Sequence, residues 1–241
     1  MDSVTRFGSR ASAYAAFRPS YPPEAIGGVL EGLGDPRTVT IADVGAGTGI
    51  SSRLFAERGA SVIAIEPNAR MRAAAEQHTR VLWREGTAER TGLADASVDA
   101  VVACQAFHWF ATSAVIEEFR RVARRRAALM QYERDEGDSF TAAYGDIVRA
   151  YASDDTEAMR AHGLAVFAEF PNARVTRKTF GAAQRLDCNA LLGRAASSSY
   201  LPSSGAAADS LRSDLRALFE RHQRGGWVEL VTVTFVLIAD W

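Results

Sequence analysis

Residues 43–49 read DVGAGTG and follow an apolar run at 39–42. The glycines at 45, 47 and 49 let the backbone of a turn approach a ligand closely, because glycine has no Cβ and adopts positive φ readily. A glycine-rich turn at the end of a strand commonly holds a nucleotide. Dinucleotide-binding turns read G-x-G-x-x-G, and their third glycine would fall at position 50, where this chain has isoleucine. The spacing therefore weakens the prediction of a pyrophosphate ligand.

An acidic residue, Glu66, follows the next apolar run, 21 residues after Gly45. A carboxylate at the end of a second strand can accept hydrogen bonds from both hydroxyls of a ribose. NAD-binding proteins and S-adenosylmethionine-binding proteins share this feature. Glu66 therefore predicts a ribose and does not by itself identify the cofactor.

The pattern around these two motifs alternates between short apolar runs and helical segments up to residue 132. Strands are expected at 39–44, 61–66, 81–85, 98–104 and 127–132, with helices at 48–58, 68–78 and 112–122. Such near-continuous apolar strands alternating with helices predict a parallel sheet covered on both faces. The alternation then breaks, and the rest of the chain predicts helices at 140–151 and 156–162, a weak strand at 174–180, a helix around 211–219 and a last strand at 228–238.

The composition places limits on partners and compartment. The chain has 241 residues and a net charge of −1, so no strong electrostatic field draws it to nucleic acid or a membrane. Only two cysteines occur, Cys104 and Cys188, without disulfide or metal-site spacing, and both are expected as small core residues. No apolar run approaches the length of a membrane span, and the polar stretch 1–10 has no signal core. We expect a cytoplasmic protein with no metal site.

The chain resembles the class I S-adenosylmethionine-dependent methyltransferases. Four segments in order carry the resemblance: YAAFRPSYP at 14–22, DVGAGTG at 43–49, AIEPNARM at 64–71 and GTAERTGLADASVDAVVACQAFHWF at 86–110. The first of these, together with the HWF triplet, looks like the small-molecule branch that includes trans-aconitate methyltransferase-like enzymes.

The resemblance implies an α/β fold of the Rossmann-like class I methyltransferase type. It implies a seven-stranded, mostly parallel sheet whose last strand is antiparallel, with helices on both faces. Residues 1–241 would form a single domain, in which helices at 1–35 form an N-terminal lid and a helical insertion at 135–170, after strand five, forms a substrate cap.

The same resemblance implies S-adenosyl-L-methionine as cofactor. Its methionine end would lie near Gly45 and Gln105, its ribose at Glu66 and its adenine near Thr87. The family often has aspartate where this chain has Thr87, so Glu89 or a backbone carbonyl could replace that contact. The expected cofactor-binding residues are Tyr14, Arg18, Asp43, Gly45, Ala46, Gly47, Gly49, Glu66, Pro67, Met71, Thr87, Ala88, Glu89 and Gln105.

His108 follows the fourth strand, where the transferred methyl group should point. It is the candidate catalytic base for a phenol or amine acceptor, and the alternative is that it only shapes the pocket wall. Methyl transfer to an ionised carboxylate needs alignment more than a base. Arg134, Arg149 and Arg194 are available to hold an acidic acceptor. The expected substrate-binding residues are Phe107, Trp109, Phe110, Tyr132, Tyr144 and Tyr200.

Two function classes remain open at this stage. The first is a cytoplasmic enzyme that transfers a methyl group to an oxygen or nitrogen of a small molecule. The second is a non-catalytic S-adenosylmethionine-binding protein that acts by association, and an NAD enzyme is a distant third because of Ile50. The arginine-rich run at 120–126 invites a nucleic-acid prediction, but we expect it at a solvated helix end, where cations complement the helix dipole.

Overall fold

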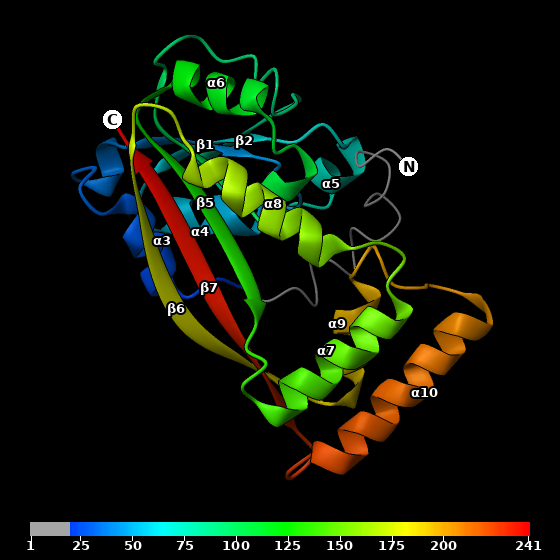
Figure 1. Ribbon diagram of the computed structural model, residues 1–241. Coiled ribbons are helices and arrows are strands. Elements are labelled where there is room, and N and C mark those ends of the chain that lie inside the picture. Colours follow the sequence, from blue (N-terminus) through cyan, green and yellow to red (C-terminus); the bar gives the residue numbers. More distant parts are fainter. Residues whose placement is uncertain (1–19) are drawn as a thin grey trace.

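The structure is a computed structural model that describes residues 20–241. A seven-stranded sheet of order β3-β2-β1-β4-β5-β7-β6 forms its centre (Figure 1). The strands are β1 (Thr40–Val44), β2 (Ser61–Ile65), β3 (Val81–Arg84), β4 (Val98–Cys104), β5 (Ala123–Arg134), β6 (Arg174–Leu186) and β7 (Val228–Asp240). Strands β1 to β5 pair in parallel, and β7 runs antiparallel to both β5 and β6. The expected mostly parallel sheet with an antiparallel last strand is confirmed.

Helices connect the strands, with the bounds α3 (Pro23–Leu30), η2 (Pro36–Thr38), α4 (Ile50–Glu57), α5 (Ala69–Ala73), η3 (Phe107–Trp109), α6 (Ser113–Val122), α7 (Ser139–Tyr151), α8 (Thr156–Ala168), α9 (Cys188–Ala196) and α10 (Gly205–His222). Asn68 caps α5 and Asp138 caps α7, each accepting a hydrogen bond from a backbone N–H of the first helical turn. Among the described residues, no helix has the length and apolarity that crossing a bilayer requires.

The two faces of the sheet bury separate apolar clusters because side chains alternate along each strand. On β4, Val102 packs with α3 and α4, whereas Val101 packs with α6 and with Phe167 of α8. A third cluster joins α7, α9 and α10, which Figure 1 shows grouped together away from the helices that cover the sheet. The expected insertion at 135–170 is thus divided, since α7 belongs to this third cluster and α8 packs against η3.

The structure corrects one expectation about the arginine-rich run. Strand β5 begins at Ala123, so the last arginines of the run lie in the sheet and not at a helix end. Arg126 is buried, pairs with Asp240 at 2.6 Å and donates to the carbonyl oxygens of Val29 and Glu31. Pairing with β4 extends β5 back to Ala123, and pairing with β7 places Arg126 opposite Asp240; sequence periodicity reveals neither pairing.

Candidate functional site

A cavity of about 300 Å³ opens where β1, β2, β3 and β4 end at their carboxyl edges. Ligands of open parallel sheets bind in this position, because the loops that leave the strands diverge there. Its volume lies at the lower end of the range for small-molecule sites. The lining residues are Tyr21, Gly45, Ala46, Gly47, Ile50, Ser51, Glu66, Pro67, Asn68, Met71, Gly86, Thr87, Ala88, Glu89, Cys104, Gln105, Ala106, Trp109, Phe110 and Tyr132.

The glycine turn forms the floor of this cavity, and Gly45 and Gly49 serve different purposes in it. At Gly45, φ is +70° and an added Cβ would lie 2.7 Å from the Cβ of Ala106, so any other residue would close the cavity at this point. At Gly49, φ is +80° and an added Cβ would lie 2.7 Å from the Trp83 ring. Gly49 caps α4 and does not line the cavity. Its absent side chain therefore allows helix and sheet to pack closely.

Glu66 is buried at the edge of the cavity and holds the glycine turn. Its Oε2 accepts a hydrogen bond from the backbone N–H of Gly47 at 2.9 Å, and its Oε1 accepts one from the N–H of Asn68 at 2.9 Å. Burial raises the pKa of Glu66, and these two N–H donors oppose that rise. A carboxylate offers about four acceptor positions, so two remain for a ligand hydroxyl.

Asp43 lies beneath the turn and does not reach the cavity lining. It is fully buried, and its Oδ2 accepts hydrogen bonds from the hydroxyls of Ser51 at 2.7 Å and Ser52 at 2.6 Å. Its Oδ1 has no hydrogen-bond partner among residues 20–241. Burial raises the pKa of Asp43 from 3.8 to about 6, because the charged form loses its hydration. The contact of Asp43 with a cofactor stays a prediction.

Gln105 presents an acceptor at the cavity wall. Its backbone has a positive φ of 55°, and its Nε2 donates to the carbonyl oxygen of Tyr132 at 2.9 Å, which fixes the amide. The buried Oε1 has no hydrogen-bond partner within the part of the chain that the structure describes. A buried acceptor of this kind is costly unless a ligand brings a donor, such as an ammonium group.

The aromatic residues after β4 divide between the cavity and the core. Trp109 and Phe110 line the cavity, whereas Phe107 packs edge-on against Phe167 of α8 in the core. His108 is buried, its ring lies 4.8 Å from that of Trp109, and it is absent from the cavity lining. Its role as a base stays a prediction.

Two other expected substrate residues lie away from this cavity. Tyr144 is buried in the third apolar cluster, and Tyr200 lines a second hollow of about 460 Å³ together with Arg134 and Arg149. Among the described residues, none from α7 or α8 lines the cavity at the strand ends, so the substrate cap stays a prediction.

Residues 42–130 match the model of a protein family described as "Methyltransferase domain". The matched segment contains the glycine turn, Glu66 and the residues after β4. These residues are therefore similar to a methyltransferase domain. The stated resemblance to class I methyltransferases is thereby confirmed for this segment.

One curated relative and two solved structures are also similar to this chain. The chain is 40% identical over 153 residues to an uncharacterized methyltransferase from Mycobacterium tuberculosis, and the match covers 61% of this chain and 60% of that relative. A crystal structure assigned as a methyltransferase of an antibiotic biosynthesis pathway from Anabaena variabilis has a TM-score of 0.68 and 21% identity, covering 94% of this chain and 98% of its own. One assigned as a type II methyltransferase from Anaeromyxobacter dehalogenans has a TM-score of 0.65 and 24% identity, covering 93% and 97%. These structures share the fold.

Most of the expected cofactor-binding residues meet at one cavity. Asp43 and Gly49 support the glycine turn from outside the lining, and Tyr14 and Arg18 lie outside the described residues. The expected residues that line the cavity are Gly45, Ala46, Gly47, Glu66, Pro67, Met71, Thr87, Ala88, Glu89 and Gln105. Of the expected substrate residues, Trp109, Phe110 and Tyr132 line it as well.

Sequence reasoning did not assign Tyr21, which lines the cavity. Its ring lies 6.0 Å from that of Tyr132, and it is buried. Tyr21 lies in the segment 14–22 that carries the resemblance, directly before the two prolines at the start of α3. Six further lining residues were not assigned. Four of them lie inside the quoted segments: Asn68, Gly86, Cys104 and Ala106. Ile50 and Ser51 are the two residues that follow the glycine turn.

Proposed function

We propose that this protein transfers a methyl group from S-adenosyl-L-methionine to an oxygen or nitrogen of a small-molecule acceptor. The observation that carries the proposal is the cavity at the strand ends, in which a glycine turn and the buried carboxylate of Glu66 face the same space. The chain spans about 60% of the length of the M. tuberculosis relative that it matches, so the activity of the whole protein is part of the proposal.

The residues present fit this cofactor. The floor at Gly45 leaves no room for a Cβ, which suits a ligand that lies directly against the backbone. The unpartnered Oε1 of Gln105 suits the ammonium of a methionine moiety. Glu66 retains acceptor positions for ribose hydroxyls after binding Gly47 and Asn68. Thr87, Ala88 and Glu89 line the cavity beyond Glu66, where an adenine would extend.

The cofactor supplies a methyl group that its sulfonium already activates for in-line displacement. This chain would then bind the cofactor and the acceptor, orient them and exclude water from the site. Gln105 is fixed by Tyr132 through a hydrogen bond, and the rings of Trp109 and Phe110 cover the apolar side of the cavity. Holding the two reactants close together and in line lowers the activation barrier by a large part. A base is needed only for an acceptor that must lose a proton.

Isothermal titration calorimetry with S-adenosylhomocysteine and with NADH tests the cofactor, and methyl-labelled S-adenosylmethionine with a pool of cell metabolites tests the reaction. We expect binding of S-adenosylhomocysteine, no binding of NADH and labelled small-molecule products. Tight NADH binding without a response to S-adenosylhomocysteine contradicts the cofactor. Binding without any labelled product supports the non-catalytic alternative.

A further inference from the structure

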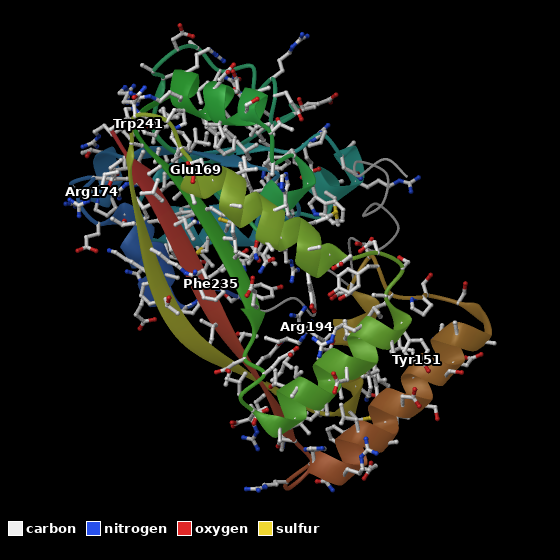
Figure 2. All side chains as sticks on the ribbon, viewed as in Figure 1. Tyr151, Glu169, Arg174, Arg194, Phe235 and Trp241 are labelled. Carbon is white, nitrogen blue, oxygen red and sulfur yellow. The ribbon has the colours of Figure 1, made fainter. Side chains whose placement is uncertain are left out.

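Arg194 lies on the buried face of α9. The buried residues of this helix are Leu191, Arg194 and Ala195, a spacing of three and four residues that defines one helical face. Arg194 is only 7% exposed, although arginine is rarely buried without a partner. Figure 2 shows it beside the carboxyl end of β5, and the centre of its guanidinium lies 5.5 Å from the ring centroid of Tyr132.

The guanidinium of Arg194 lacks the carboxylate partner that other inward-facing arginines have. Arg126 pairs with Asp240, and Arg134 pairs with Glu157 and Glu136. Arg194 forms no ion pair with any residue from 20 to 241, and its buried Nε has no hydrogen-bond partner there. Its only interaction among these residues is with the π face of Tyr132. An uncompensated buried cation is strongly unfavourable, so this position is suited to an anion from outside the described residues.

The neighbourhood of Arg194 joins the candidate active site. Tyr132, beneath the guanidinium, lines the cavity at the strand ends. Its carbonyl oxygen accepts a hydrogen bond from the side-chain amide of Gln105. The residue paired with Tyr132 on β7 is the buried Thr234, whose side chain lies on the same face of the sheet. Arg194 is not among the residues that line this cavity, so Tyr132 is the residue that links the guanidinium to the cavity wall.

We propose that Arg194 determines acceptor specificity by binding a carboxylate group of the methyl acceptor. The planar guanidinium matches a carboxylate through two parallel hydrogen bonds. One buried positive charge balances one carboxylate, whereas a phosphate monoester would leave excess negative charge in the same buried place. The inference rests on the proposed methyl transfer and adds to it the chemical class of the acceptor.

The first test uses the wild-type protein and needs no variant. The protein saturated with S-adenosylhomocysteine is heated with matched pairs of benzoate and benzamide, cinnamate and cinnamamide, and tricarballylate and its triamide. The same pairs are then incubated with methyl-labelled S-adenosylmethionine. We expect at least one acid to raise the melting temperature and to accept label while its amide does neither. If no acid exceeds its amide in either measurement, the proposal is wrong.

The second test compares Arg194→Gln with Arg194→Lys and Asp2→Asn. Asp2 is the single carboxylate in the stretch 1–19, so its substitution shows whether an internal ion pair satisfies Arg194. For the accepted acid, Arg194→Gln should raise KM by about 10- to 100-fold, the effect of losing hydrogen bonds between charged groups. Arg194→Lys should recover part of that loss, and Asp2→Asn should change little. The affinity for S-adenosylhomocysteine should stay within twofold in all three variants.

Failure of this inference can be distinguished from failure of the proposed function. If S-adenosylhomocysteine binds and labelled products form only from neutral acceptors, Arg194 is not an acceptor-binding residue although the methyltransferase activity stands. An unchanged KM in Arg194→Gln, or an equal effect of Asp2→Asn, overturns the inference as well. If S-adenosylhomocysteine does not bind, the proposed function itself is wrong.

Discussion

Replacing Glu66 with glutamine tests the ribose contact with the smallest change in shape. The carboxylate accepts from Gly47 through Oε2 and from Asn68 through Oε1, each at 2.9 Å. In glutamine one of these oxygens becomes an NH₂ group, which cannot accept, and the negative charge disappears. Hydrogen bonds that involve a charged group contribute about 1.5–3 kcal/mol, so the dissociation constant for S-adenosylhomocysteine should rise about 10- to 150-fold.

The structure changes what should be expected of Glu66→Ala. The sequence alone predicts that a strand-end carboxylate can be removed without harm to the fold. In the structure, however, Glu66 is only 8% exposed and accepts hydrogen bonds from two backbone N–H groups at the cavity. Alanine would leave both donors buried without an acceptor, which destabilises the turn as well as the binding. Glutamine keeps one acceptor and is therefore the cleaner variant.

Calorimetry with S-adenosylhomocysteine at pH 7.5 measures the effect, and Glu85→Gln is the matched control. Glu85 follows the neighbouring strand β3, and its side chain is 76% exposed. It pairs with Arg72, which also donates a hydrogen bond to the backbone carbonyl oxygen of Glu66. Burial raises the pKa of Glu66 above its usual 4.5, so the wild-type affinity should fall as the pH drops through that raised pKa. If Glu66→Gln binds as tightly as the wild type, the reasoning about the ribose is refuted.

Three further outcomes are expected. Gly45→Ala should abolish binding of S-adenosylhomocysteine in calorimetry because the new Cβ meets Ala106, whereas Gly92→Ala, with a similar φ of +72° and open space around it, should bind normally. Burial raises the pKa of Asp43 from 3.8 to about 6 in the folded state. Between these pH values the folded protein keeps a proton that the unfolded chain has already lost. The free energy of unfolding of the wild type should therefore fall by about 3 kcal/mol as the pH rises from 3.8 to about 6. Urea denaturation of Asp43→Asn at pH 4 and pH 7 should lack this loss, and an unchanged pH dependence would contradict the assignment. If His108 acts as a base, turnover of the wild type should fall below about pH 6.5 and His108→Gln should lower turnover by roughly 10²–10⁴-fold, whereas a flat profile leaves it as a structural residue.

The order of strands and helices from β1 to β5 could be predicted from the sequence because its signals are local. Apolar runs ended by glycine or acidic residues specify strand ends, and parallel strands bring those ends to one edge of the sheet. Gly45, Glu66 and Gln105 were assigned to one site on this basis, and all three line the same cavity. The helix α9 was missed, since it is short and Arg194 interrupts its apolar face.

Contacts between distant segments decided the rest. Insertion of β7 between β5 and β6 placed Asp240 beside Arg126, and no local pattern encodes that pairing. Which of the aromatic residues after β4 face the cavity depends on α8, against which Phe107 packs. The burial of Arg194 over Tyr132 likewise joins α9 to a strand that lies much earlier in the chain. Local periodicity determines which face of an element is apolar, and only the folded chain determines what that face meets.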